Sequence, residues 1–212
     1  MKDHQCYSPE THLLSTAQIK ALPDDRVRVL VSACLAGQVT TWDAQPLGML
    51  PILEHFLALP QVEKCTFCPE EYSFGTPREM SNCYGGNGFD VLDGRAKILT
   101  DTGVDWTEGM VRAAHAMAAR AAEQKVDLAI LLNISAACGT QTIYDGHRDD
   151  KNYQRGPGVA AAALIRAGIP VLSNRDLKTM AALVKRYDPS FEAPEGLIDL
   201  HEHPWYKETF GA

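Results

Sequence analysis

Three of the six cysteines stand where they could bind a metal together. Cys34, Cys68 and Cys138 each come just after a segment that is predicted to be a buried strand. In open α/β sheets, ligands bind in the crevice outside the carboxyl ends of the strands, so cysteines far apart in the sequence would converge there. Three thiolates without an obvious fourth are the ligand set of a metal or cluster that keeps one coordination position open. An open position is what metal catalysis requires.

Other interpretations of these cysteines remain, because cysteine is also among the residues most often buried in protein cores. Cys65 and Cys68 form a Cys-x-x-Cys motif that could be half of a zinc site, but no second Cys-x-x-Cys or Cys-x-x-His completes it. We interpret Cys6, Cys65 and Cys83 as spare thiols. Cys65 is the one that could replace Cys68 as a ligand.

The elements that must position these cysteines alternate between strands and helices. Apolar, β-branched runs predict strands at 27–33, 62–67, 126–132 and 169–172. Apolar residues at helical spacing predict helices at 47–59, 105–124, 156–167 and 176–186, the second with a capping box formed by Asp105 and Glu108. Residues 69–94, rich in Gly and Pro, are expected to be irregular. The alternation predicts an α/β fold with a mostly parallel sheet covered by helices on both faces.

Length and charge limit the classes of function. With 212 residues we expect a single domain at 27–187, an N-terminal extension at 1–26 and a C-terminal tail at 188–212. The net charge is −7 and no basic stretch exceeds two residues, which argues against nucleic acid as a partner. No apolar run is long enough to span a membrane, and the first residues lack the apolar core of a signal peptide. We therefore expect a soluble, cytoplasmic protein.

Six short motifs form an ordered set along the chain. In the first half they are Ser-Ala-Cys-Leu-Ala-Gly at 32–37, Phe-Cys-Pro-Glu at 67–70 and Thr-Pro-Arg at 76–78. In the second half they are Ser-Ala-Ala-Cys-Gly at 135–139, Ile-Tyr-Asp-Gly at 143–146 and Gly-Pro-Gly-Val at 156–159. From about 27 to 174 the chain thereby resembles the thiouracil desulfidase family, long catalogued as a domain of unknown function.

The resemblance implies a Rossmann-like domain that carries an oxygen-sensitive [4Fe-4S] cluster held by three cysteines. By motif matching, the ligands are Cys34, Cys68 and Cys138, and the fourth iron is free to bind the sulfur of a thiolated base. The implied activity is the non-redox removal of sulfur from a small thiolated pyrimidine base or nucleoside, such as thiouracil to uracil plus sulfide. The chain departs from the family pattern within 41–44, 72–78 and 135–139.

Desulfidation needs a group that takes a proton from water, and acidic side chains near the cysteines are the candidates. Glu70, two residues after Cys68, is the first choice; its alternative is a solvated loop acid. Ser135 could hydrogen-bond the substrate or relay a proton, or could be an ordinary turn hydroxyl. Asp43 is a secondary acid candidate, as is Asp145, and each could instead be a turn residue.

Three further residues are candidates for binding the substrate. Arg78 could orient its loop, contact the carbonyl of the base, or pair with Glu79. Trp42 and Tyr144 could stack on a flat heterocycle, or could belong to the rim of the core.

The residues leave two other classes of function open. One is a binding module whose thiols sense metal or redox state without turnover. The other is a conventional nucleotide-binding Rossmann enzyme, which the missing Gly-x-Gly-x-x-Gly after the first strand argues against. A thiolated tRNA substrate is disfavoured by the negative charge. The sequence gives no indication of the oligomeric state.

Overall fold

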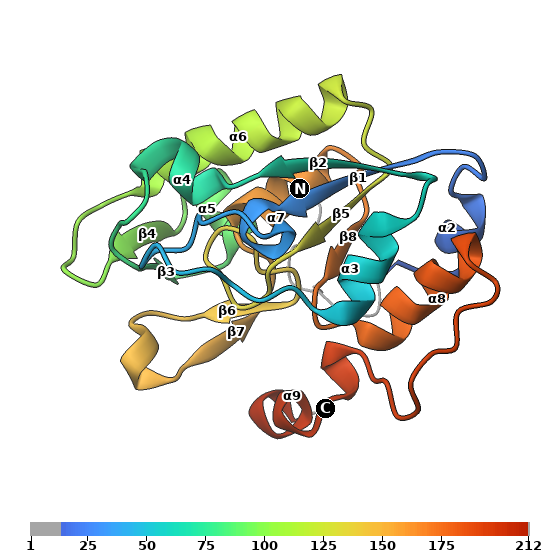
Figure 1. Ribbon diagram of the computed structural model, residues 1–212. Coiled ribbons are helices and arrows are strands. Elements are labelled where there is room, and N and C mark those ends of the chain that lie inside the picture. Colours follow the sequence, from blue (N-terminus) through green and yellow to red (C-terminus); the bar gives the residue numbers. More distant parts are fainter. Residues whose placement is uncertain (1–13, 212) are drawn as a thin grey trace.

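A parallel sheet of four strands forms the centre of the molecule (Figure 1). The computed structural model describes residues 14–211. Across the sheet the strands follow the order β2 (Val62–Phe67), β1 (Val27–Ser32), β5 (Leu128–Leu131) and β8 (Val171–Ser173). Helices lie against the sheet, which confirms the predicted α/β class. The chain runs from β1 outward to β2 and later returns to the other side of β1, so β1 and β5 flank the point where the strand order reverses.

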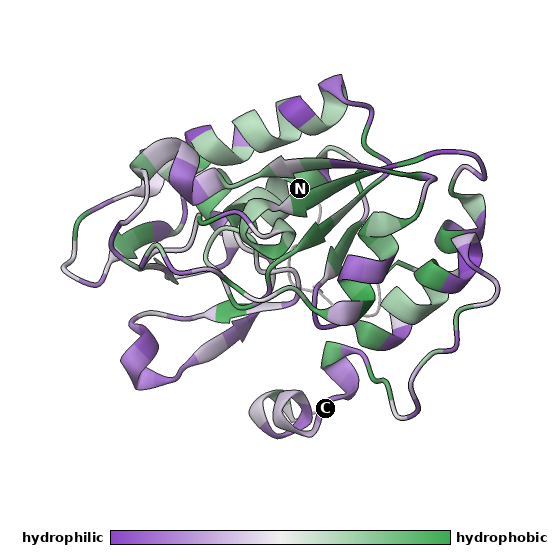
Figure 2. Cartoon of the chain, in the orientation of Figure 1, coloured by the Kyte–Doolittle hydropathy of each residue, from purple (hydrophilic) through white to green (hydrophobic). Residues whose placement is uncertain are grey.

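The apolar side chains of the strands divide between two cores because neighbouring residues of a strand point to opposite faces. Val29, Val31 and Ile130 belong to one core, whereas Leu30 and Ala129 belong to the other. Both faces of β1 and β5 are therefore buried, as continuous apolar runs predict for a parallel sheet. Figure 2 shows these hydrophobic strands at the centre of the molecule.

One group of helices covers each face of the sheet. The first core is closed by α2 (Thr16–Ala21), α3 (Pro51–Ala58) and α8 (Leu177–Tyr187). The second core is closed by α5 (Gly88–Leu92), α6 (Thr107–Glu123) and α7 (Val159–Arg166). None of the helices within residues 14–211 combines the length and apolar character that a membrane crossing requires.

The prediction of one irregular stretch at 69–94 is wrong. It contains helix α4 (Pro69–Phe74), strand β3 (Ser81–Tyr84) and α5, and β3 pairs with the antiparallel strand β4 (Lys97–Thr100). Two residues of this stretch help to begin its helices. Pro69 occupies the first turn of α4, where a missing N–H costs nothing, and the Asn87 side chain accepts the Phe89 N–H to cap α5.

The capping box predicted at the start of α6 is also wrong. The helix begins at Thr107, with Trp106 at the N-cap position. Asp105 lies one residue further out, and its Oδ1 accepts the Thr107 N–H at 3.0 Å. The carboxylate therefore still satisfies a free N–H of the first turn, but Glu108 takes no part in the reciprocal bond.

The last part of the fold is a small hairpin with a helix beside it. Strands β6 (Thr142–Tyr144) and β7 (Tyr153–Arg155) are antiparallel and joined through the 3₁₀ turn η3 (Arg148–Asp150). After α8 the chain continues into the 3₁₀ turn η4 (Leu200–Glu202) and helix α9 (Pro204–Phe210), which lies beside the hairpin in Figure 1. The division into an extension, a domain and a tail stays a prediction, and residues 1–13 of the extension lie outside the described part of the chain.

A buried carboxylate ties these last elements to the sheet. Asp176 is fully buried after β8, and its two oxygens accept hydrogen bonds from Gln141 Nε2 at 2.8 and 2.7 Å. They also accept the N–H groups of Ser173 and Leu200. Burial raises the pKa of Asp176 to about 6, with a further contribution from Asp199, although the hydrogen bonds oppose this shift.

We expect this carboxyl group to make stability depend on pH. Its pKa is higher in the folded than in the unfolded chain, so its contribution is fully present below its ordinary pKa and is lost as the pH rises through about 6. The free energy of unfolding of the native chain, minus that of Asp176→Asn, should fall by roughly 3 kcal/mol between about pH 4 and pH 7. Urea denaturation across this range measures the difference, and parallel pH profiles for the two proteins would contradict the assignment.

Candidate functional site

The carboxyl ends of β2, β1 and β5 open into one cavity of about 330 Å³. Nine of the ten candidate residues of the sequence analysis line it: Trp42, Asp43, Arg78, Tyr144, Glu70, Ser135, Cys34, Cys68 and Cys138. Asp145 does not line the cavity, and its Oδ1 accepts Gln154 Nε2 at 3.3 Å. We expected the three cysteines to converge because each follows a strand of one parallel sheet. In the structure all three line a single cavity. The role of each residue stays a prediction.

Cys34 and Cys68 are held by short helical turns that begin where their strands end. Cys34 lies in the 3₁₀ turn η2 (Ala33–Ala36), which Gly37 closes with a φ of 83°, a conformation that favours glycine. Cys68 is the N-cap of α4, and its Sγ accepts the Glu71 N–H at 3.4 Å. The Cys68 thiol also lies 3.6 Å from the Thr40 carbonyl oxygen. Backbone geometry thus fixes the place of both residues, and backbone contacts also hold the Cys68 sulfur.

Cys138 lies in a tight loop after β5, in which few other residue types would fit at the neighbouring positions. Ser135 Oγ accepts the Ala137 and Cys138 N–H groups at 3.2 and 3.1 Å, so the turn role foreseen for this hydroxyl is real. These bonds occupy its lone pairs and leave its O–H as a donor. A Cβ on Gly139 would lie 2.8 Å from the Ser135 carbonyl oxygen, so only glycine fits. Ile134, with a φ of 55°, holds a strained conformation for a β-branched residue.

The three sulfurs influence one another across the cavity. Burial raises the pKa of the Cys34 thiol to about 12, and Cys68 adds to the shift. Burial also raises the pKa of Cys138 well above its ordinary value, with further contributions from Cys68 and Cys34. Burial and then Glu70 raise the pKa of Cys68. These raised pKa values favour the neutral thiols. A cationic centre among the three sulfurs would instead favour the thiolates, because metals bind the thiolate form.

The donor set suits a cluster better than a single ion. Within residues 14–211, no three His, Cys, Asp or Glu side chains are arranged to hold one metal ion. The cysteine ligands of an iron–sulfur cluster bind different irons, so they surround a larger volume than the ligands of a zinc ion. Three cysteines around one cavity therefore fit a cluster with one iron lacking a cysteine.

The other cysteines lie elsewhere. Cys65 belongs to β2 and lines a different cavity, together with Glu63 and Gln124. Cys83 is fully buried in the core, 3.9 Å from the Ala136 carbonyl oxygen. Cys6 lies outside the described residues. The geometry thus favours Cys68 over Cys65 as a ligand, although the assignment stays a prediction.

Arg78 joins the segments around Cys68. Its side chain is only 4% exposed, and its Nη2 donates to Glu70 Oε2 at 3.3 Å and to the Thr40 carbonyl at 2.9 Å. Its Nη1 donates to the Gly75 carbonyl and to Thr76 Oγ1. The sequence analysis considered a pair of Arg78 with Glu79, but Arg78 pairs with Glu70 instead, and the Glu79 carboxylate accepts the Thr102 hydroxyl.

We call the part of the cavity lining formed by Ser81, Asn82, Tyr144 and Arg148 its far wall. Apart from Tyr144, the sequence analysis missed these residues. Arg148 lies over the Tyr144 ring, 5.4 Å from its centroid, and its Nη2 donates to Asn82 Oδ1 at 3.3 Å. Ser81 lines the same wall. Its Oγ and the Nε of Arg148 are buried and have no partner among the described residues. No motif marks these residues, and Ser81 and Asn82 fall in the stretch that was expected to be irregular.

A family model and a solved structure point to the same family. A family model described as 2-thiouracil desulfurase matches residues 29–176. The uncharacterized protein YbbK of Bacillus subtilis (strain 168) is 38% identical over 151 residues, which are 70% of this chain and 97% of YbbK. A solved structure of the [4Fe-4S]-dependent thiouracil desulfidase TudS is similar with a TM-score of 0.61 and 30% identity, over 74% of this chain and 96% of TudS.

We expect Arg78 to contribute to stability through its buried ion pair. Arg78→Met leaves the Glu70 carboxylate and the Thr40 carbonyl without this donor, so the free energy of unfolding should fall by about 3 kcal/mol. Arg26→Met is the matched control, because Arg26 forms an exposed pair with Glu63 that should be worth less than about 1 kcal/mol. Urea denaturation compares the two variants, and equal losses would contradict a structural role for the Arg78 pair.

Proposed function

The chain belongs to the 2-thiouracil desulfurase family, and from this premise we propose that it is a [4Fe-4S]-dependent desulfidase for small thiolated pyrimidine bases or nucleosides. The enzymes of this family cleave carbon–sulfur bonds. The observation that carries the proposal is the set of three cysteines from neighbouring strands in one cavity that also contains Glu70 and Ser135. The reaction is a non-redox, hydrolase-type exchange of sulfur for oxygen.

Cys34, Cys68 and Cys138 would hold the cluster. When bound, the cluster supplies an iron without a cysteine ligand, a soft Lewis acid suited to the sulfur of a thiocarbonyl group. The chain itself supplies the surroundings of that group. The cavity is lined by the three cysteines together with polar and aromatic side chains, among them Glu70, Ser135 and Tyr144.

Glu70 is the group that takes a proton from water. Its carboxylate lines the cavity two residues after Cys68, and the buried Arg78 fixes one of its oxygens at 3.3 Å. Water adds to the carbon of the C=S group as Glu70 accepts its proton, and the carbon–sulfur bond then breaks. The oxygen of water stays on the ring, and the sulfur leaves as hydrogen sulfide with both protons. Asp43 is the second choice, since it is exposed and its Oδ1 accepts the Gln45 N–H.

The remaining lining residues bind and orient the ring. Ser135 keeps its O–H as a donor for a heteroatom of the base, and Trp42 and Tyr144 offer aromatic faces to a flat heterocycle. Arg78 has Nη1 and Nη2 engaged by several acceptors, which supports a positioning role for it. Its Nε is buried without a partner in the described part of the chain, which leaves a donor for the base. The partnerless donor of Arg148 supports a contact with the substrate from the far wall.

Anaerobic purification followed by iron and acid-labile sulfide analysis tests the proposal. We expect about four irons and four sulfides per chain, as for one cubane cluster, together with sulfide release from a thiouracil. Zinc in place of iron, with no product from any thiolated base, would instead support a metal- or redox-sensing module without turnover.

Single cysteine variants test the ligand assignment. Cys34→Ser, Cys68→Ser and Cys138→Ser should each lose iron and sulfide release, because each removes one of three ligands. Cys65→Ser is the matched control, since Cys65 lies three residues from Cys68 but lines a different cavity, and it should retain both. The assignment is wrong if Cys65→Ser loses the cluster while Cys68→Ser keeps it.

Glu70→Gln tests the proton acceptor. The amide cannot accept a proton, so kcat should fall about 100-fold or more, with an unchanged iron content and visible spectrum. Glu71→Gln is the control, because Glu71 is exposed and does not line the cavity, and its kcat should stay near that of the native chain. Steady-state sulfide release measures both, and full activity of Glu70→Gln would transfer the role to another group.

A further inference from the structure

We propose that residues 199–210 brace the β6–β7 hairpin and thereby set the far wall of the substrate cavity, with Trp205 as the main positioning residue. The inference rests on the proposed function for the identity of the ligand. The family match covers residues 29–176, which include the hairpin and exclude the brace. The brace is therefore a feature of this chain beyond the part that the family model describes.

The hairpin supplies the far wall but has few strands to stabilise it. Tyr144 in β6 and Arg148 in η3 both line the cavity. The hairpin is a separate two-stranded sheet, and such a unit is marginally stable unless it packs against something else. On the side of the body, the Gly146 N–H donates to the Cys83 carbonyl at 2.8 Å, and Gln154 Nε2 donates to the Gly86 carbonyl at 3.1 Å.

A row of aromatic rings connects the cavity to α9. Tyr144 and Tyr153 are paired across the hairpin, and their ring centroids are 4.9 Å apart. The ring of Trp205 meets Tyr153 edge to face, at 5.0 Å and 88°. Arg148 in turn lies over the Tyr144 ring. Movement of Trp205 would therefore be passed through two rings to the residues of the cavity wall.

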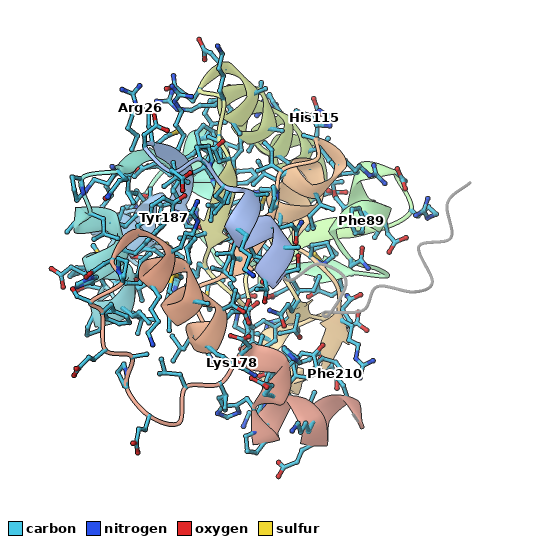
Figure 3. The ribbon with its side chains drawn as sticks, turned by 90° about the vertical axis from the view of Figure 1, so that its right-hand side faces the viewer. Arg26, Phe89, His115, Lys178, Tyr187 and Phe210 are labelled. Carbon is cyan, nitrogen blue, oxygen red and sulfur yellow. The ribbon has the colours of Figure 1, made fainter. Side chains whose placement is uncertain are left out.

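A second contact joins the same two elements at the end of α9. Arg155 in β7 donates from Nη2 to the Phe210 carbonyl at 3.1 Å, and its guanidinium lies 5.3 Å from the centroid of the Phe210 ring. Figure 3 labels Phe210 on α9, close to the hairpin. The helix is thus attached to β7 at two points, Tyr153 and Arg155.

The segment before α9 is itself fixed to the body, which a brace requires. Asp199 accepts the Thr179 N–H at 2.9 Å and the Thr179 hydroxyl at 2.7 Å, at the start of α8. Lys178 pairs with Glu202 at 2.7 Å. Asp176 accepts the Leu200 N–H as well as Gln141 Nε2, so one carboxylate holds both the start of the brace and the residue before β6.

The experiment compares variants of the full chain loaded with its cluster. In Trp205→Ala, amide hydrogen exchange of residues 142–155 should be several-fold faster, because the hairpin loses one of its two contacts with α9. The KM for a thiouracil should rise about tenfold while kcat changes less than about twofold, as for a lost wall contact. Trp205→Phe keeps an aromatic edge and should restore both. Glu208→Ala, on the exposed side of the same helix, should change neither.

Each outcome decides the inference. Unchanged exchange in the hairpin, or faster exchange with an unchanged KM, would overturn it. If Trp205→Ala fails to fold, Arg155→Ala removes the second contact from an exposed position and should give the same two changes. If the native chain releases no sulfide, the proposed function fails separately, and the exchange of the hairpin still decides whether α9 braces it.

Discussion

The parallel alignment of β1 with β2 and β5 is the constraint on which the site depends. The pairing of Ser32 with Phe67, and of Val31 with Ile130, brings the carboxyl ends of three strands to one edge of the sheet. A register shift of one residue would exchange the side chains of a strand between the two cores, so the different packing on the two faces fixes the alignment. The loops that carry the cysteines can then be short, and their sulfurs take positions set by the sheet.

Around this edge, buried charge is balanced locally. The Arg78 guanidinium is desolvated but meets carbonyl oxygens, a hydroxyl and the Glu70 carboxylate. Such a pair adds little net stability compared with an apolar replacement, but the loss of one partner is costly. The pair between Arg78 and Glu70 instead fixes the position of the carboxylate. A carboxylate that is held at one oxygen can present its other oxygen to the cavity. The backbone strain at Ile134 also costs stability, and it is consistent with a site in which a required geometry is kept at that cost.

The sequence predicts those features that depend on local pattern. The strands around Val29 and Ile130 are recognisable in the sequence as continuous apolar segments. Because parallel strands end at the same edge of a sheet, the cysteines that follow them must lie at one edge. The helices and strand within 69–94 are too short to show a period, and their Pro and Gly serve as caps rather than breaks. The contacts of Arg78 with Glu70, and of Arg148 with Tyr144, are tertiary and leave no spacing signal. The candidate residues were thus predictable, but their partners were not.

The contact between Trp205 and Tyr153 has a consequence for the order in which the molecule is built. A ribosome releases the chain from its N-terminal side, and folding during synthesis follows that order. Cys34, Cys68 and Cys138 all precede Trp205 by a wide margin. A nascent chain can therefore assemble the edge of the sheet that carries the sulfurs while the opposite wall still lacks its support. On the proposed function, the pocket for the cluster would form first, and the wall that contacts the ligand would gain its support last.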